Sequence, residues 1–212
     1  MHSRLLAPGP RKATRMSSEL PGDHPELTRG IRQVLYTQEQ IRGQVAELGQ
    51  AISRDYAGRN PLMIGVLKGV VFFMADLLRA LTIPAEVDFI AVSSYSSEAR
   101  EHGMVRLVKD LETSISGRHV LFIEDVIDTG LTLHYLLQTL RARQPASLEV
   151  CVLLDKSSSR LLDIPIKYRG FDLPPYFVVG YGLDFRERYR NLPFIGLLSA
   201  DVFQNTKTAN QG

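Results

Sequence analysis

The chain has 212 residues, of which 44% are hydrophobic and 23% are charged, and this composition excludes a chain that is disordered throughout. The formal net charge of +2 gives no reason to expect a nucleic-acid partner. No stretch approaches the roughly 18 consecutive apolar residues of a membrane span, so a soluble protein is expected. The single cysteine, Cys151, lies in an apolar run and cannot form an internal disulfide, which predicts a buried thiol in a reducing, cytoplasmic setting.

Both ends of the chain are predicted to be tails. Residues 1–30 are expected to form a disordered extension, because their first half is basic and its apolar patch is too short for a secretory signal. A true start at Met16 and a transit peptide are the alternatives. Residues 201–212 are expected to form a flexible C-terminus.

The first helix is predicted over residues 37–52. Thr37 and Gln40 stand at the spacing of a capping box, and the apolar residues that follow recur on one helical face. An apolar strand follows Pro61, and apolar residues at 3.6-residue spacing predict a helix over residues 70–81. This strand and helix form the first βα unit.

The middle of the chain continues the alternation of strands and helices. The remaining elements are predicted as strands over 85–92, 105–109, 119–123 and 148–155 and a helix over 131–143. The polar loop between the strands at 85–92 and 105–109 is long for a compact domain, and such loops are often lids or binding loops. The repeated pattern predicts an α/β fold with a parallel, twisted sheet flanked by helices.

After Ile164 the rhythm changes to short apolar strands punctuated by Pro and Gly, without a long helix between them. This pattern predicts a small β-rich hood lobe. We expect a single domain over 31–200, with a core of about 45–164 and a hood made of 165–200 together with about 31–44.

The run "VLFIEDVIDTGLTL" at residues 120–133 sets three acids beside an apolar strand. In parallel sheets ligands bind at the carboxyl ends of strands, where Glu124 and Asp125 are expected. Gly130 permits a tight turn, and the backbone N–H groups before the next helix can hold a phosphate, helped by the hydroxyls of Thr129 and Thr132. Acids for sugar hydroxyls or hydrated Mg²⁺ therefore stand beside an anion cradle.

A simpler interpretation is that these acids only solvate a strand end and that Asp128 caps the following helix. Three acids in five residues disfavour it, because like charges repel when they are partly desolvated. The chain has no GxxxxGK[ST] motif, and no GxGxxG motif follows a strand, so the common ATP and dinucleotide motifs are unsupported.

The acidic run resembles the phosphoribosyl pyrophosphate (PRPP) motif of the type I phosphoribosyltransferases. The resemblance implies that Glu124 and Asp125 contact the ribose hydroxyls and Mg²⁺. It implies that the 5′-phosphate is wrapped by residues that follow the acidic pair: Asp128, Thr129, Gly130, Leu131 and Thr132. It also implies that Asp128 is the catalytic residue, accepting the purine N7 proton.

Two further stretches resemble the purine-salvage branch of that family. "GVLKGVVFF" resembles its diphosphate loop, which assigns Lys68 and Gly69 to diphosphate and suggests a cis Leu67–Lys68 peptide. "VCVLLDKSSSR" places Lys156 where the family's lysine donates to the 6-oxo group of a purine. Taken alone, these stretches could be an ordinary strand-to-helix turn and a solvated strand-end lysine.

The run "YFVVGYGLDFRERYRNLPFIG" resembles the oxopurine-binding region. The resemblance implies that Phe177 stacks on the base and that backbone groups near Val178 hold its edge. It further implies that Asp184 binds a second Mg²⁺ and that Arg190 contacts diphosphate. Ser94 and Tyr95, in "SSYSS", resemble a mobile lid.

The resemblance implies a purine-salvage transferase with Mg²⁺ as cofactor. Such an enzyme would form IMP or GMP and diphosphate from PRPP and hypoxanthine or guanine. The alternatives are a nucleotide-sensing regulator on the same fold and an enzyme for xanthine, adenine or orotate. A homodimer or homotetramer is expected from the family, with no nucleic acid and no membrane as a partner.

Overall fold

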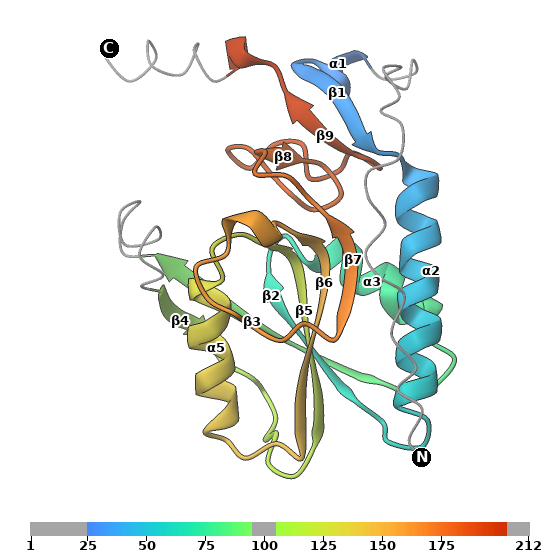
Figure 1. Cartoon of the computed structure of the whole chain (residues 1–212), viewed down its shortest axis with the longest axis vertical. Coiled ribbons are helices and arrows are strands. Elements are labelled where there is room, and N and C mark those ends of the chain that lie inside the picture. The colour runs from blue at the N-terminus through green and yellow to red at the C-terminus, as the bar shows by residue number, and fades with distance from the viewer. Residues whose placement is uncertain (1–24, 95–104, 203–212) are drawn as a thin grey trace.

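The computed structural model describes residues 25–94 and 105–202. Within these ranges a six-stranded main sheet lies below a three-stranded hood sheet (Figure 1). The elements are, in chain order, α1 (Pro25–Thr28), β1 (Ile31–Tyr36), α2 (Gln38–Asp55), β2 (Leu62–Leu67), α3 (Val71–Ala80), β3 (Glu86–Ser94), β4 (Val105–Lys109), β5 (His119–Ile127), α5 (Leu131–Arg141), β6 (Ser147–Asp155), the 3₁₀ helix η1 (Ser157–Ser159), β7 (Tyr168–Asp172), β8 (Val178–Val179) and β9 (Ile195–Leu198).

The main sheet has the strand order β4-β3-β2-β5-β6-β7, and its neighbouring strands are parallel except at one edge. The predicted α/β fold with a flanked parallel sheet is therefore confirmed for five of the six strands of the main sheet. Edge strand β4 runs antiparallel to β3, which the sequence did not indicate. Only residues 95–104 join the two strands, and a parallel return needs a crossover of a dozen or more residues.

The prediction that residues 165–200 all belong to the hood is wrong for β7. This strand pairs in parallel with β6 and is the last strand of the main sheet. Its connection from β6 contains only the short helix η1, so the sequence offers no helical period that would mark a crossover. The hood sheet itself consists of β1, β9 and β8, all antiparallel.

Helices cover both faces of the main sheet (Figure 1). One core cluster joins α2 and α3 to the sheet and continues into the hood through Val178, Tyr181 and Ile195. A second cluster lies under α5. The capping box at the start of α2 is confirmed, since Gln40 N donates to Thr37 Oγ1 at 3.3 Å and Thr37 N donates to Gln40 Oε1 at 2.8 Å.

The expected disorder of residues 1–30 is wrong for the last part of that range, where α1 forms and leads into β1. The segment is attached to the hood by two bonds: Ser199 N donates to Gly30 O at 2.8 Å, and the Tyr189 hydroxyl donates to Arg29 O at 3.1 Å. Residues 1–24 and 203–212 lie outside the described residues. No helix in the described part of the chain is long and apolar enough to cross a membrane.

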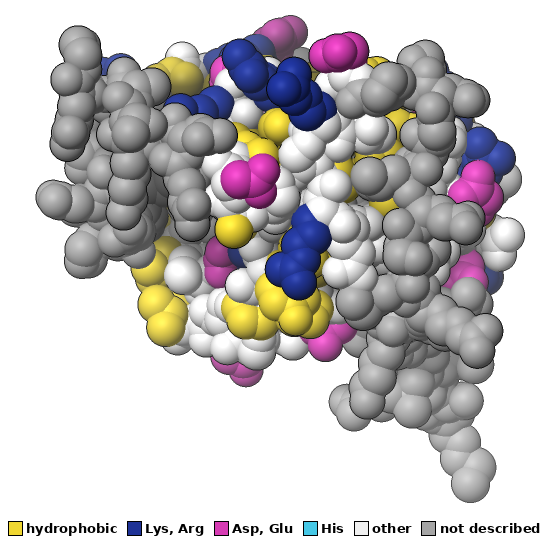
Figure 2. Space-filling view, turned by 90° about the horizontal axis from the view of Figure 1, so that it is seen from above, with side chains coloured by type: hydrophobic (Ala, Val, Ile, Leu, Met, Phe, Trp, Pro, Cys, Tyr) yellow, Lys and Arg dark blue, Asp and Glu magenta, His cyan; other side chains and the backbone are white. Residues whose placement is uncertain are grey.

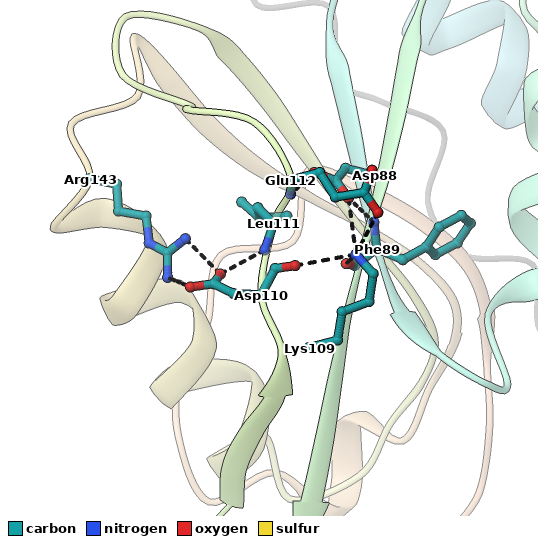
Figure 3. Close-up of polar contacts among 7 residues, drawn as sticks. All are labelled: Asp88, Phe89, Lys109, Asp110, Leu111, Glu112 and Arg143. Carbon is teal, nitrogen blue, oxygen red and sulfur yellow. Dashed lines mark hydrogen bonds and ion pairs between the residues drawn. The ribbon is translucent and has the colours of Figure 1, made fainter.

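Ion pairs of Lys109 and Asp110 anchor the edge of the main sheet at the end of β4 (Figure 3). Lys109 Nζ lies 3.5 Å from Asp88 Oδ1, a carboxylate that is almost fully buried, and donates to Phe89 O at 2.8 Å. Asp110 accepts two bonds from the Arg143 guanidinium, at 2.7 and 2.9 Å. The first pair ties β4 to β3, and the second ties the segment after β4 to the segment after α5.

Helices α2 and α3 approach so closely that one contact leaves no room for a side chain. A Cβ added at Gly49 would lie 2.7 Å from both the Cβ and the carbonyl oxygen of Ala80, whereas a Cβ at Gly43 would meet nothing within 4 Å. Gly49→Ala should therefore lower the free energy of unfolding by about 1–3 kcal/mol. Gly43→Ala, on the same helix, should raise it by about 0.5–1 kcal/mol. Urea unfolding of both variants checks this, and equal effects would contradict the close packing.

Candidate active site

The site residues gather where the order of the main sheet reverses. From β2 the chain passes through α3 to β3 on one side, whereas β5 pairs with β2 on the other side. Ligands of open α/β sheets bind in the crevice at the carboxyl ends of such strands. The pairing of β5 with β2 ends at Gly65 and Ile123, but β5 stays paired with β6 up to Ile127. Glu124 and Asp125 therefore lie in β5, just beyond the last β2 pair.

These two acids are poorly solvated. Glu124 is 9% exposed, and burial, together with the charge of Asp125, raises its pKa well above the usual value. Asp125 is partly buried, and burial raises its pKa from 3.8 to about 6, although hydrogen bonds from backbone N–H groups oppose the rise. Two adjacent carboxylates that resist ionisation are suited to a partner that brings positive charge or hydroxyl donors.

Three backbone segments converge on Asp125. A Cβ added at Gly69 would lie 1.9 Å from Asp125 Oδ2, and a Cβ at Gly182 would lie 2.0 Å from Gly69 O. The turn after β2, the acidic strand β5 and the hood thus meet at positions where only glycine fits. The Leu67–Lys68 peptide in the first segment is cis, as the resemblance suggested. Gly182 was not recognised from the sequence, because its role depends on a contact over more than 100 residues.

The phosphate cradle predicted after β5 lies at the start of α5. Gly130 has φ +83° and directly precedes the helix, so the chain turns sharply between Thr129 and Leu131. The first N–H groups of any helix lack acceptors within the helix and carry a positive partial charge. Thr132 lies in this first turn. The local backbone is thus of the kind that binds a phosphate.

Asp128 and Lys156, predicted for catalysis and purine recognition, lie together. Lys156 Nζ donates to Asp128 Oδ2 at 2.7 Å, and the lysine side chain is 12% exposed against 56% for the aspartate. The two residues come from neighbouring strands, just past the ends of β5 and β6. The lysine donor and the aspartate acceptor could therefore form hydrogen bonds with an adjacent acceptor and donor on one edge of a base.

The hood contributes the predicted stacking residue. Phe177 is 49% exposed, and its ring makes an edge contact with Phe185, with ring centroids 5.8 Å apart. Val178, the next residue, is buried in β8 and pairs with Leu197 of β9. A half-exposed aromatic ring held by a buried strand is suited to stacking against a flat ligand.

Glu187 joins the residues predicted to contact diphosphate, and the sequence analysis missed it. Lys68 Nζ lies 3.2 Å from Glu187 Oε1, and Arg190 Nη2 lies 3.3 Å from Glu187 Oε2 and 2.9 Å from Asp184 Oδ1. The cations Lys68 and Arg190 lower the pKa of the Glu187 carboxyl, mainly through hydrogen bonds. The run of alternating charges at 184–190 was the only available signal. Figure 2 views the molecule from the hood side and shows basic and acidic side chains interspersed on that face.

The predicted lid is only partly covered by the structure. Ser94 is the last residue of β3, whereas Tyr95 lies outside the described residues. Among the described residues, no group of three or more His, Cys, Asp or Glu side chains could hold a metal ion by itself. The acids nonetheless fit Mg²⁺ that is shared with a ligand, because Glu124, Asp125 and Asp184 offer carboxylate oxygens and Mg²⁺ usually keeps several water or phosphate ligands.

Comparison with known proteins identifies the family of the chain. The phosphoribosyl transferase domain family matches residues 33–186. The hypoxanthine-guanine phosphoribosyltransferase of Mycobacterium tuberculosis (strain CDC 1551 / Oshkosh) is 49% identical over 199 residues, which cover 90% of this chain and 98% of that protein. The chain belongs to the phosphoribosyl transferase domain family.

Solved structures show the same fold. A hypoxanthine-guanine phosphoribosyltransferase from Bacillus anthracis, with a HEPES molecule in its active site, matches with a TM-score of 0.77 at 43% identity, covering 80% of this chain and 99% of that one. A hypoxanthine phosphoribosyltransferase from Staphylococcus aureus matches with a TM-score of 0.79 at 43% identity, covering 82% and 95%. The architecture is therefore that of the type I phosphoribosyltransferases.

The raised pKa of Asp125 predicts a stability effect with a definite sign. A carboxyl whose pKa is higher in the folded state stabilises the fold when protonated, and this contribution is lost as the pH rises through about 6. A rise from 3.8 to about 6 corresponds to about 3 kcal/mol. Without Mg²⁺ and substrate, Asp125→Asn should match the wild type near pH 4 and exceed its unfolding free energy by up to this amount at pH 8.

Asp110→Asn is the control of opposite sign, because the Arg143 guanidinium lowers the pKa of Asp110. Its stabilisation is present above the usual pKa and is lost as the pH falls. This variant should therefore be less stable than the wild type at pH 8 and approach it in acid. Denaturant titrations across pH 4–8 measure both differences. An Asp125→Asn advantage that does not change with pH would contradict the burial of this charge.

Proposed function

We propose that the protein is a hypoxanthine-guanine phosphoribosyltransferase of purine salvage. It transfers the phosphoribosyl group of PRPP to hypoxanthine or guanine and releases IMP or GMP and diphosphate. The observation that carries the proposal is the Lys156–Asp128 pair, which lies just past the ends of β5 and β6, with Asp128 between the acidic pair and the Gly130 turn in the sequence. The identity to the named relatives supports it.

PRPP would bind along β5 and the start of α5. Glu124 and Asp125 accept the ribose hydroxyls, and the turn from Thr129 to Thr132 donates backbone and hydroxyl hydrogen bonds to the 5′-phosphate. The burial of the Glu124 and Asp125 carboxylates favours this assignment, because ribose hydroxyls would donate hydrogen bonds to acceptors that water reaches poorly. The turn is preformed in the ligand-free chain, so little ordering is required.

The purine would bind between the sheet and Phe177. Lys156 donates to the 6-oxo group and Asp128 accepts the N7 proton, and these two purine groups are neighbours on one edge of the base. The 2.7 Å contact between lysine and aspartate supports the pairing, because a donor and an acceptor this close together can reach two neighbouring atoms of one base. A 6-amino group would face the Lys156 donor with another donor, which selects against adenine.

Displacement at ribose C1 builds positive charge on the sugar and negative charge on the leaving diphosphate. Lys68 and Arg190 would hold the diphosphate, which takes the place of Glu187 as their anionic partner. Glu124, Asp125 and Asp184 would hold Mg²⁺, which when bound neutralises diphosphate charge. Asp128 takes the N7 proton as N9 attacks.

We also propose that residues 31–200 act as one domain, which the core shared between hood and main sheet supports. The exposed apolar side chains Val71 and Phe72 at the start of α3 support a homodimer or homotetramer. A cytoplasmic location, with no nucleic acid or membrane as partner, completes the proposal. Light scattering on the purified chain tests the oligomeric state.

The function is tested by incubating the chain with PRPP, Mg²⁺ and each purine in turn and following nucleotide monophosphate. Formation of IMP and GMP is expected, with adenine inactive. Formation of AMP alone, or no product with any purine despite tight PRPP binding, would contradict the proposal. The second of these outcomes would instead favour a nucleotide sensor, and efficient use of xanthine would broaden the substrate range.

Asp128→Asn should lower kcat by about 10² or more, because an amide cannot accept the N7 proton. The dissociation constant of PRPP should stay nearly unchanged, since the phosphate turn is intact. Steady-state kinetics together with PRPP binding by calorimetry measure both quantities. Asp110→Asn serves as the matched control, because its carboxylate pairs with Arg143 at the sheet edge. Equal losses of binding and turnover would assign Asp128 a different role.

Lys68→Ala should weaken diphosphate binding more than purine binding. The lysine side chain is 67% exposed and pairs only with exposed Glu187 among the contacts described, so its removal leaves the core intact. Product inhibition by diphosphate and the KM for hypoxanthine are the two measurements. A larger effect on hypoxanthine than on diphosphate would remove Lys68 from the diphosphate loop.

A further inference from the structure

The carboxylate of Asp155 lies fully buried at the end of β6, directly before Lys156. Two guanidinium groups contact it. Arg160 Nε donates to Oδ1 at 2.9 Å and Arg160 Nη2 lies 2.5 Å from Oδ2, while Arg169 Nε lies 2.8 Å from Oδ2. The carboxylate thus joins the loop after β6 to strand β7.

Stability alone gives a weak reason for this arrangement. The free energy that a buried ion pair gains from its attraction is often no larger than the cost of removing both charges from water. Apolar side chains of similar volume packed in its place can give the same stability. The ion pair does offer fixed geometry, because a guanidinium and a carboxylate meet in a planar, two-point contact. The residues that this contact holds in place therefore indicate its role.

The first of these is Lys156. Its backbone N donates to Ile127 O at 3.0 Å, and Leu173 N donates to Asp155 O at 2.9 Å, so the Asp155–Lys156 peptide is bound to β5 on one side and to the residue after β7 on the other. The Lys156 side chain then emerges toward Asp128. A shift of Asp155 would displace the amine that faces the purine.

The second is the phosphate turn. Arg160 Nη1 donates to Ile164 O at 3.2 Å, which closes the loop that follows η1. From this loop, Leu161 N donates to Thr129 O at 3.0 Å. A Cβ added at Gly130 would lie 3.1 Å from Ile164 Cδ1, so the loop also packs against the turn itself.

We propose that the Asp155–Arg160 ion pair is a positioning device that fixes purine and 5′-phosphate recognition together. The carboxylate sets the base of Lys156, and the guanidinium sets the loop that supports Thr129 and Gly130. Asp155 touches neither substrate and acts through these residues. The inference rests on the proposed function, because it assigns Lys156 to the purine carbonyl.

The test exchanges the ion pair for neutral amides. Asp155→Asn combined with Arg160→Gln keeps the net charge and the approximate shape. The matched control, Asp110→Asn with Arg143→Gln, removes another arginine–aspartate ion pair, at the sheet edge and more exposed (Figure 3). Arg160→Lys is the second variant, since it retains the buried charge but loses the planar fork.

The readout compares hypoxanthine with unsubstituted purine, which lacks the 6-oxo group, as substrate or competitor, and includes the KM for PRPP. Displacement of Lys156 should reduce the preference for hypoxanthine over unsubstituted purine by about 10- to 100-fold and raise the KM for PRPP. Both quantities are measured well below the melting temperature of each variant. Arg160→Lys should shift both quantities in the same direction by less. The sheet-edge control should change neither.

The possible outcomes separate a failure of the inference from a failure of the proposed function. If the double variant loses activity equally with hypoxanthine and with unsubstituted purine and its KM for PRPP is unchanged, the ion pair has a purely structural role and the inference is overturned. If the double variant fails to fold, Arg160→Lys decides: an unaltered preference for hypoxanthine over unsubstituted purine in that variant would also overturn the inference. Wild-type protein that forms no nucleotide would reject the proposed function and the inference with it. An active wild type with an unaltered variant would reject the inference alone.

Discussion

The desolvation of two adjacent carboxylates is the constraint around which the site is built. Glu124 and Asp125 lie in β5 because pairing with β6 continues past the last pair with β2, and burial raises the pKa of both groups. Gly69 lets the turn after β2 approach Asp125 without a clash. The ligand-free fold therefore contains an electrostatic cost that a ribose diol with a divalent cation would relieve.

The other charged groups of the site form ion pairs with one another in the ligand-free protein. Lys156 is paired with Asp128, and Lys68 and Arg190 share Glu187. Under the proposed assignments, substrate would exchange these internal partners for the groups of PRPP and purine, so each new contact would contribute only the difference between the two pairings. This exchange limits affinity and keeps the ligand-free site free of uncompensated cations, which suits an enzyme that has to release its product.

Local patterns in the sequence predicted features that are contiguous. The strand end with Glu124 and Asp125, the turn at Gly130 and the capping box of α2 each fit within a few residues and could be predicted from spacing. The direction of β4, the placement of β7 in the main sheet and the contact of Gly182 with Gly69 could not, because each depends on pairing between distant segments. Glu187 was missed for the same reason, since its partner Lys68 comes from another lobe.

Strand β7, which the sequence analysis placed in the hood, also completes the ion-pair cluster next to Lys156, the lysine proposed to bind the purine. Asp155 looks like an ordinary polar residue at the end of an apolar strand, and nothing near it in the sequence predicts that it is fully buried. It becomes buried because β7 returns in parallel beside β6 and brings Arg169 to its carboxylate, while the helix-poor crossover brings Arg160. The connection that obscured the topology thus provides one guanidinium and β7 the other, and both contact the carboxylate next to Lys156.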